Sequence, residues 1–452
     1  MNAFFIGIGG MGMSGIAKIL KQTGHHVAGS DRNLEGDYCR RLKALGVDLY
    51  LQDGTGLEAF LAAHSLQPAE IVVVKSTAVE DQVPDVIAAR RLGIREMMRS
   101  DLLAQLFHEK QGIAIGGSAG KTTTTGLVTW LLKFAGFEPT SAVGGIVSGL
   151  ETNALAGTGP HFVIEADESD GSIVKYHSHI ALLTNISRDH KTMDELMELF
   201  RTFLSNVHPD GTVLVCSDDA QNLELMKTLT RPVVTYGIGP EATIRAENIV
   251  IGQDQITFTV AGCPFTLLLP GMHNVQNALG AIAIGMRLNI PLEEIAAALL
   301  AFPGMKRRFE RVGTARGVTV VDDFAHNPAE IQAAIKTARH ASRRRFIVYQ
   351  PHGFGPTRFT RPDLVKVFSE LNPEETLYLD DIFYGGGTVE KDISSRDIIE
   401  EVRHRNPNAF YLGDRRQIVE RIAKEARQGD MVLVMGARDI NTICRQILDY
   451  LQ

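Results

Sequence analysis

The segment from Gly112 to Gly126, GIAIGGSAGKTTTTG, constrains the fold of this chain more than any other stretch. Residues 113–116 predict a short buried parallel strand, and a glycine-rich turn then leads through Lys121 and Thr122 into a predicted helix. A strand, turn and helix of this kind direct several backbone N–H groups and a helix N-terminus at one point, where an anion can bind. The segment therefore predicts an α/β domain with a phosphate-binding loop.

The residues after the turn indicate that the anion is the triphosphate of ATP. Lys121 adds a mobile positive charge, and the hydroxyl of Thr122 can bind a magnesium ion that bridges the phosphates. The general phosphate-loop pattern fits only in a compact form, with Gly116 four residues before Gly120. A glycine-rich hairpin with a surface lysine is the structural alternative, and the flanking strand and helix patterns disfavour it. The predicted ATP loop consists of Gly117, Ser118, Ala119, Gly120, Lys121, Thr122 and Thr123.

Length and composition limit the class of protein. A chain of 452 residues predicts about three domains. The net charge of −7 comes with no long basic run, so we expect no nucleic-acid partner. The four cysteines are scattered without metal-ligand spacing, which is typical of a reducing, cytoplasmic environment. No apolar run has the length of about 18 residues that a membrane span needs, and the first residues do not resemble a signal peptide.

Predicted strands alternate with predicted helices along the whole chain, which favours an α/β fold. We predict three domains. Residues 1–110 form a Rossmann-like N-terminal domain, residues 111–312 a central phosphate-loop domain with a mostly parallel sheet, and residues 313–452 a Rossmann-like C-terminal domain.

The first domain opens with a glycine-rich turn at residues 7–12, between a strand and a helix predicted at residues 16–22. Asp31 follows the next strand, so the segment has the G-x-G-x-x-G pattern with an acidic residue about 20 positions later. NAD, FAD and UDP-sugars all satisfy this pattern, because each places a pyrophosphate over a helix N-terminus. Ser76 and Thr77 follow another predicted strand, either as ligand contacts or as simple caps.

The central domain carries two further candidate sites. Four carboxylates in the six residues 165–170 follow a predicted strand, and they predict a bound cation or substrate amine unless the loop is merely solvated. His190 follows the next strand as a metal ligand, a base or a structural residue. Asn274 and Asn277 lie three apart on a predicted helix, where they either read the edge of an adenine or cap the helix.

The C-terminal domain is preceded by a basic linker at residues 303–311, which is either a solvated hinge or the source of an arginine for the phosphates. Predicted strands then lead to Asp323 and to His352. Residues 246–259 alternate apolar and polar positions, as a half-exposed antiparallel sheet does.

In this order the motifs GIGGMGMSGIA, GGSAGKTTTTG, EADESD, TNISRDH, MHNVQNA, GMKRRFE, DDFAHNP and YQPH resemble those of the Mur ligase family, the ATP-dependent amide ligases of peptidoglycan synthesis. The resemblance covers nearly the whole chain. It implies that ATP and Mg²⁺ activate the carboxylate of UDP-N-acetylmuramate as an acyl phosphate, to which an amino acid, L-alanine, is then joined. A recycling ligase that adds a tripeptide, or a ligase for another amino acid, is the alternative within the family. The resemblance does not fix the oligomeric state, which we expect to be monomer or dimer.

The resemblance also implies roles for individual residues. The catalytic residues would be Lys121, Glu165, His190 and Arg308, and the magnesium ligands Thr122, Glu165 and His190. Beyond the phosphate loop, ATP would contact Asn274, Asn277 and Asp323. The UDP substrate would contact Gly9, Gly10, Met11, Gly12, Asp31, Ser76, Thr77 and Arg99. The amino acid would contact Phe324, His326, His352, Arg358 and Arg361.

The chain departs from the family pattern in four places. Ala119 replaces a histidine or asparagine of the phosphate loop, and the segment after His190 is short and lacks a second aspartate. Phe324 replaces a tyrosine, and residues 353–356 appear as an insertion after His352. The last two departures concern the part that would bind the amino acid. A lysine is also missing from the helix predicted over residues 193–206, which agrees with the alanine-adding branch.

Two other classes of protein fit less of the sequence. A nicotinamide-dependent oxidoreductase would explain the first glycine turn and Asp31, but it leaves Lys121, Thr122 and Glu165 without a role. A non-catalytic ATP-binding regulator of the same fold would not need the intact Lys121, Glu165 and His190.

Overall fold

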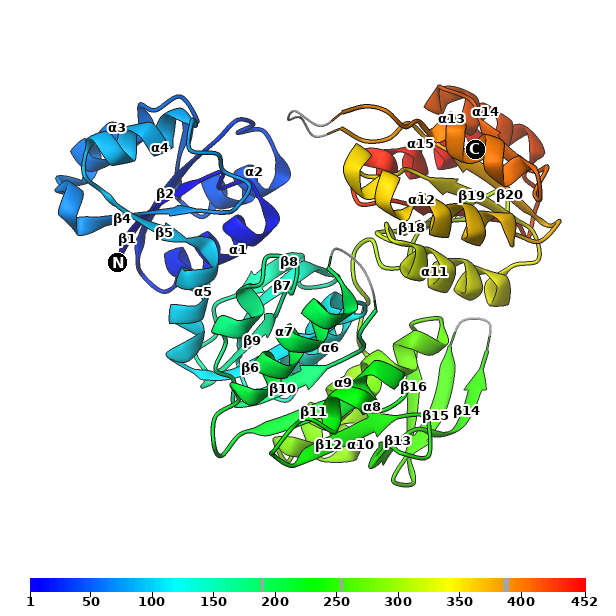
Figure 1. Cartoon of the computed structure of the whole chain (residues 1–452), viewed down its shortest axis with the longest axis horizontal. Coiled ribbons are helices and arrows are strands. Elements are labelled where there is room, and N and C mark those ends of the chain that lie inside the picture. Colours follow the sequence, from blue (N-terminus) through cyan, green and yellow to red (C-terminus); the bar gives the residue numbers. More distant parts are fainter. Residues whose placement is uncertain (188–190, 253–254, 385–389) are drawn as a thin grey trace. The chain divides into compact units, whose positions relative to one another are not determined.

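The computed structural model describes residues 1–187, 191–252, 255–384 and 390–452, and it is α/β throughout (Figure 1), which confirms the predicted fold class. The chain divides into two compact units. The first unit comprises Met1–Glu247, Thr259–Phe265 and Gln276–Phe302, and the second Asn248–Phe258, Thr266–Val275 and Pro303–Gln452. The boundaries between the three predicted domains stay a prediction.

The N-terminal sheet is five-stranded and fully parallel, in the order β3-β2-β1-β4-β5. Its elements are β1 (Asn2–Ile6), α1 (Met11–Gln22), β2 (His26–Asp31), α2 (Asp37–Ala44), β3 (Asp48–Leu51), α3 (Gly56–His64), β4 (Ile71–Lys75), α4 (Pro84–Arg91), β5 (Arg95–Met98) and α5 (Arg99–His108).

Alternate side chains of β1 point to two different cores, which shows that helices cover both faces of this sheet. Ala3 and Phe5 pack with α1, α2 and α5, whereas Phe4 and Ile6 pack with α3 and α4. Helix α1 begins at Met11, earlier than predicted, because the glycine turn runs directly into its first turn. The backbone N–H groups of this helix start therefore lie at the carboxyl end of β1.

The central sheet has eight strands in the order β13-β12-β11-β10-β6-β9-β7-β8, and only the pairing of β7 with β8 is antiparallel. Its elements are β6 (Gln111–Gly116), α6 (Lys121–Phe134), β7 (Thr140–Val147), β8 (Thr152–Leu155), β9 (His161–Glu165), β10 (Ile180–Leu183), α7 (Met193–Ser205), β11 (Thr212–Cys216), α8 (Ala220–Met226), β12 (Val233–Gly237) and β13 (Ile244–Arg245).

Helix α6 continues directly from the glycine turn and carries the single tryptophan of the chain, Trp130. The indole Nε1 donates a hydrogen bond to the carbonyl of Ala298 at 2.9 Å, and the ring packs edge-on against Phe302. Trp130 is therefore a packing residue between α6 and α10 (Leu292–Leu300).

Three further strands, β14 (Glu247–Ile251), β15 (Ile256–Val260) and β16 (Cys263–Leu267), form a small sheet in that order. The predicted alternation holds in β15, where Ile256, Phe258 and Val260 are buried and the residues between them are not. Helix α9 (Met272–Arg287) follows this sheet.

The C-terminal sheet has the order β17-β18-β22-β19-β20-β21, and only β17 runs antiparallel to its neighbour. Its strands alternate between two cores, one with α11, α12 and α13 and one with α14 and α15. The elements are β17 (Glu310–Ala315), β18 (Val318–Asp323), α11 (Pro328–Ala341), β19 (Arg345–Tyr349), α12 (Phe354–Ser369), β20 (Glu375–Leu379), α13 (Ser395–Arg403), β21 (Ala409–Tyr411), α14 (Arg415–Glu425), β22 (Met431–Met435) and α15 (Thr442–Leu451).

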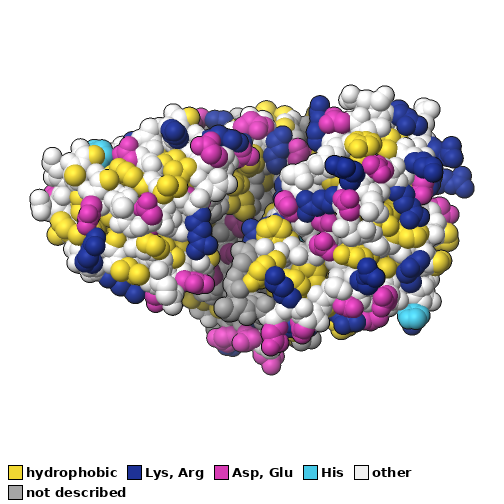
Figure 2. All heavy atoms as spheres, turned by 90° about the horizontal axis from the view of Figure 1, so that it is seen from above, with side chains coloured by type: hydrophobic (Ala, Val, Ile, Leu, Met, Phe, Trp, Pro, Cys, Tyr) yellow, Lys and Arg dark blue, Asp and Glu magenta, His cyan; other side chains and the backbone are white. Residues whose placement is uncertain are grey.

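Over the described residues, none of the helices combines the length and the apolar character that crossing a bilayer requires. On the face shown in Figure 2, lysine and arginine side chains are interspersed with aspartate and glutamate. That pattern agrees with the small net charge of −7.

Candidate active site

The phosphate loop connects β6 to α6 and is held in place by the segment that follows β10. Ala119 donates its N–H to Oδ1 of Asn185 and accepts hydrogen bonds at its carbonyl from Thr184 Oγ1 and Asn185 Nδ2, at 2.9, 2.7 and 2.9 Å. The Ser118 N–H donates to the carbonyl of Asn185 at 2.9 Å. Strands β6 and β10 are neighbours in the sheet, so the two carboxyl ends lie together. The loop is therefore pre-formed by its own protein contacts.

Two glycines of the loop are required by conformation and by space. Gly117 and Gly120 have φ values of 131° and 83°, a region that side chains disfavour. A Cβ atom at Gly117 would lie 2.0 Å from Thr184 Oγ1, and one at Gly120 would lie 2.4 Å from Asn277 Oδ1. A side chain at either position would therefore clash with Thr184 or Asn277.

The side chain of Lys121 forms a buried ion pair inside the loop. Its Nζ lies 2.8 Å from Oε2 of Glu168 and donates to the carbonyl of Gly117 at 2.6 Å. Burial opposes the charge of Lys121, but the carboxylates of Glu168 and Glu165 prevail and raise its pKa. Burial also raises the pKa of Glu168, despite the opposing effect of Lys121. The sequence placed Glu168 in an acidic cluster but gave it no role.

The predicted magnesium ligands Thr122 and Glu165 are in contact. Thr122 Oγ1 donates to Oε1 of Glu165 at 3.0 Å, and the N–H of Gly144 donates to Oε2 of Glu165 at 2.8 Å. A hydroxyl and a carboxylate beside a phosphate loop suit Mg²⁺, which takes few protein ligands and completes its shell with waters and phosphates. The described residues contain no group of three His, Cys, Asp or Glu side chains that could hold a metal. The third predicted ligand, His190, lies outside the described residues.

The two predicted adenine contacts are buried and bonded to protein groups. Asn274 donates from Nδ2 to the carbonyl of Pro270 at 2.7 Å, and Oδ1 of Asn277 accepts from Thr124 Oγ1 at 3.3 Å. Asn277 thereby connects α9 to the helix of the phosphate loop. Their contact with adenine stays a prediction.

The N-terminal glycine turn is braced by Asp31, whose Oδ2 accepts a hydrogen bond from the N–H of Gly9 at 2.9 Å. Arg99 lies against Gly12, where a Cβ atom would be 3.3 Å from its Nη1, and it also donates to Oδ2 of Asp170 at 3.2 Å. The start of α1 at Met11 supplies backbone N–H donors beyond the carboxyl end of β1, and Arg99 adds a positive charge beside them. The other predicted contacts, Gly10, Ser76 and Thr77, follow the ends of β1 and β4.

In the second unit, Asp323 ends β18 and is half-buried. Its carboxylate accepts from the N–H groups of Phe309 and Ala325 at 2.7 and 2.8 Å. Burial raises the pKa of Asp323 to about 6, although Arg308 lowers it in part. The ring of Phe324, next in the chain, lies 5.2 Å from the guanidinium carbon of Arg308.

His326, Glu330 and Arg308 form a charged cluster at the start of α11. His326 Nδ1 lies 3.2 Å from Oε2 of Glu330, and Arg308 Nη1 lies 3.7 Å from Oε1. Burial alone would raise the pKa of Glu330, but the hydrogen bond and charge of His326, with the charge of Arg308, lower it to about 2. Burial disfavours charge on His326 too, and Glu330 nevertheless raises the pKa of that imidazole. Arg308 therefore carries its charge beside a carboxylate.

The remaining predicted amino-acid contacts follow β19. His352 accepts a hydrogen bond at Nε2 from Nε of Arg438, a residue for which the sequence gave no signal. Arg358 pairs with Asp392, and Arg361 pairs with Glu401. The structure thus brings His352 to an unforeseen arginine and gives the two predicted arginines carboxylate partners.

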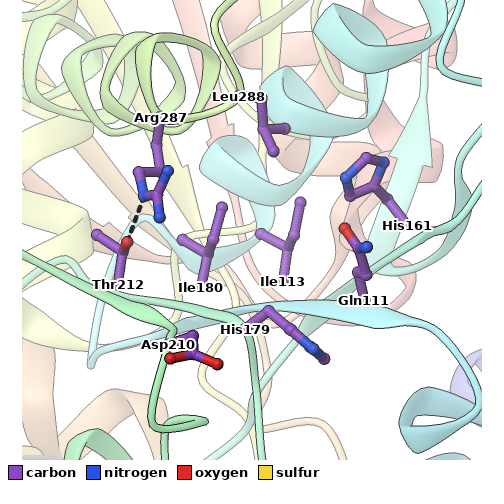
Figure 3. A pocket seen from close by; sticks show the side chains of 9 residues that line it. All are labelled: Gln111, Ile113, His161, His179, Ile180, Asp210, Thr212, Arg287 and Leu288. Carbon is purple, nitrogen blue, oxygen red and sulfur yellow. Dashed lines mark hydrogen bonds between the residues drawn. The ribbon is translucent and has the colours of Figure 1, made fainter.

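A pocket of about 220 Å³ lies at the amino ends of β6, β9, β10 and β11 (Figure 3). The phosphate loop follows the carboxyl end of β6, so this pocket is at the opposite edge of the sheet. Arg287 donates to Thr212 across it, and the buried Nδ1 of His161 has no partner among the described residues. The pocket is separate from the predicted ATP site.

Family models and relatives agree on one family. Models described as "Mur ligase family, catalytic domain", "Mur ligase middle domain" and "Mur ligase, glutamate ligase domain" match residues 3–111, 115–285 and 307–438. The UDP-N-acetylmuramate–L-alanine ligase of Pelotomaculum thermopropionicum is 37% identical over 97% of this chain and 95% of its own. The UDP-N-acetylmuramate–L-alanine ligase of Geobacter sulfurreducens is 36% identical over 96% of this chain and 94% of its own.

Solved structures share the fold. A UDP-N-acetylmuramate-alanine ligase from Thermotoga maritima matches with a TM-score of 0.81 and 24% identity over 99% of this chain and 98% of its own. A murein peptide ligase from Psychrobacter arcticus matches with a TM-score of 0.73 and 24% identity over 100% and 98%. With sequence relatives above a third identical over nearly the full length of both chains, and with all three family models in order, this chain belongs to the Mur ligase family.

Proposed function

We propose that the protein joins L-alanine to the carboxylate of UDP-N-acetylmuramate, with hydrolysis of ATP to ADP and phosphate, in peptidoglycan synthesis. The observation that carries this proposal is the pre-formed phosphate loop, in which Lys121 pairs with Glu168 and Thr122 bonds to Glu165, in a chain whose full-length relatives bear the name of that ligase. We further propose that it works in the cytoplasm, where ATP and UDP-sugars are available.

The reaction needs activation because a carboxylate repels nucleophiles. Transfer of the γ-phosphoryl group of ATP to the substrate carboxylate gives an acyl phosphate and ADP. The amine of the amino acid then attacks the acyl carbon, and phosphate leaves from the tetrahedral intermediate. This route requires positioning and charge stabilisation, and it requires no covalent nucleophile from the protein.

Residues of the first unit would bind the phosphates of ATP, the metal ions and the UDP substrate. The backbone from Gly117 to Thr123 holds the phosphates, and Lys121 moves from Glu168 to the phosphate oxygens. Thr122 and Glu165 would hold Mg²⁺, with His190 as ligand of a second ion. When bound, the metal neutralises charge on the transferred phosphoryl group. The glycine turn, Asp31, Ser76, Thr77 and Arg99 would hold the UDP substrate.

The residues of the second unit have proposed roles in the same reaction. Arg308 would supply positive charge for the transferred phosphoryl group, Asp323 would contact the nucleotide, and Phe324, His326 and His352 would contact the amino acid. The assignment of Arg358 and Arg361 to the amino acid stays a prediction, as do the contacts of Asn274 and Asn277 with adenine.

The test is the substrate dependence of phosphate release. Purified protein with ATP and Mg²⁺ should release phosphate only when UDP-N-acetylmuramate and an amino acid are both present. A panel of L-alanine, glycine, L-serine and the murein tripeptide identifies the amine, and we expect the highest kcat/KM for L-alanine. Phosphate release without either co-substrate would contradict the proposal, and a preference for the tripeptide would indicate the recycling ligase.

A further inference from the structure

Arg438 and His352 lie together at the carboxyl edge of the C-terminal sheet. Arg438 follows β22 and His352 follows β19, and these strands are parallel neighbours. The Nε of Arg438 donates to Nε2 of His352 at 2.9 Å. The ligands of open α/β sheets bind at this edge, beyond the carboxyl ends of the strands.

Five other arginines of the segments around this edge are already neutralised. Each has a carboxylate partner within ion-pair distance: Arg307 with Asp322, Arg308 with Glu330, Arg358 with Asp392, Arg361 with Glu401, and Arg415 with Asp380 and Asp439. Over the ranges that the structure describes, Arg438 has no carboxylate partner, and its guanidinium makes a single hydrogen bond, the one to His352. Arg438 therefore brings to this edge a positive charge that no carboxylate of the described residues pairs with.

The guanidinium of Arg438 is also held in orientation. Its central carbon lies 5.6 Å from the ring centre of Phe383, so the aromatic ring supports the cation. Phe383 is fixed in turn, because its N–H donates to the carbonyl of Pro351 and its carbonyl accepts from the N–H of Gly353, at 2.9 and 3.0 Å. With Nε bonded to His352, the two Nη groups keep their donors for a ligand. A planar guanidinium of this kind is suited to two parallel hydrogen bonds to a carboxylate.

We propose that Arg438 binds the α-carboxylate of the incoming amino acid and that His352 acts as a positioning residue for its guanidinium. This inference rests on the proposed function and extends it. The amine must keep its lone pair available to attack the acyl phosphate, so the carboxylate is the group by which the protein can hold an amino acid without blocking the reaction. Recognition by Arg438 meets that requirement.

The experiment compares two amines in the full-length protein, at saturating ATP and UDP-N-acetylmuramate. L-Alanine carries the carboxylate, and L-alaninamide lacks its charge. In Arg438→Ala we expect the KM for L-alanine to rise roughly 10- to 100-fold, as for loss of a charge-assisted hydrogen-bonded pair, with the KM for ATP unchanged. In the same variant, the ratio of kcat/KM for L-alanine to kcat/KM for L-alaninamide should decrease. Arg438→Lys keeps the charge without the planar guanidinium. Its KM for L-alanine should lie between those of the wild type and Arg438→Ala.

The control is Arg445→Ala, which removes an exposed arginine of α15 that pairs with Asp449 and should leave every constant unchanged. His352→Ala should raise the KM for L-alanine less than Arg438→Ala does. An unaltered KM for L-alanine in both Arg438 variants, or a rise in the KM for UDP-N-acetylmuramate instead, would overturn the inference. Absence of phosphate release from the wild-type protein with every amine would instead be a failure of the proposed function.

Discussion

At the scale of single residues, Lys121 is paired with a carboxylate of the protein. Its ammonium group is held by Glu168, and the two side chains are only 12% and 8% exposed. A buried charge is costly without a partner, so Glu168 stabilises the loop around Lys121. We expect the same carboxylate to compete with the phosphates of ATP for Lys121 and to repel them. We therefore expect Glu168 to stabilise the loop and to weaken the binding of ATP.

Removal of the carboxylate should separate these two effects. In Glu168→Gln we expect a lower midpoint of thermal unfolding without ligand, because Lys121 loses its buried partner. We also expect a larger increase of that midpoint on addition of ATP, corresponding to roughly 3- to 10-fold tighter binding, about 1 kcal/mol. Differential scanning fluorimetry over a range of ATP concentrations measures both quantities.

The matched control is Asp167→Asn, which removes an exposed carboxylate one residue away. Compared with Glu168→Gln, it should have little effect on the unfolding midpoint without ligand and on the increase of that midpoint with ATP. If ATP raised the unfolding midpoint of Glu168→Gln by no more than it does for the wild type, competition between Glu168 and the phosphates would be excluded.

At the scale of elements, the start of α11 depends on ionisation. Asn327 caps the helix by accepting from the N–H of Glu330 at 3.0 Å, while the Glu330 carboxylate bonds to His326. The pKa of Glu330 falls from 4.5 to about 2 on folding, so its contribution to stability is present above about pH 4.5 and is lost as the pH falls toward 2. The pKa of His326 is raised from 6.5, so its contribution is full below that pH and is lost above it.

We therefore expect the cluster to stabilise the protein most between about pH 4.5 and 6.5. The difference in unfolding free energy between the wild type and Glu330→Gln should reach at most about 3 kcal/mol there and shrink at lower pH. Urea unfolding followed by circular dichroism at several pH values measures it. Glu420→Gln, an exposed position on α14, is the control, and a difference that did not decrease below pH 4.5 would refute the role of Glu330.

Local sequence patterns predict single elements of this protein, but they do not predict contacts between strands that are distant in the sequence. The unit from β6 to α6 was predictable because glycines, an apolar strand and Lys121 are contiguous in the sequence. The pairing of Lys121 with Glu168 depends on β6 lying beside β9, and strand order is not encoded in any local pattern. Arg438 was missed for the same reason, since its partner His352 comes from another strand. The helix start at Met11 was placed too late because glycines favoured a turn.

At the scale of the whole molecule, three α/β regions share one reaction that has two chemical steps. The first step, carboxylate phosphorylation, requires no amine. The intermediate should therefore be trapped by a strong neutral nucleophile in place of the amino acid.

With hydroxylamine instead of L-alanine, we expect a hydroxamate of UDP-N-acetylmuramate to form only when ATP and Mg²⁺ are present. Its ferric complex gives a colorimetric measurement. Chelation of the metal with EDTA should abolish the product, and added Mg²⁺ should restore it. Hydroxamate formation at the same rate without ATP would show that no acyl phosphate is involved.

Trp130 has a practical consequence for each of these measurements. It is the single indole of the chain, and it lies on the helix that begins at the phosphate loop, with its N–H bonded to Ala298. Its ultraviolet emission therefore originates from one location, on the helix that begins at the phosphate loop. The molecule carries its own optical reporter, and occupancy of the loop is open to titration without any attached dye.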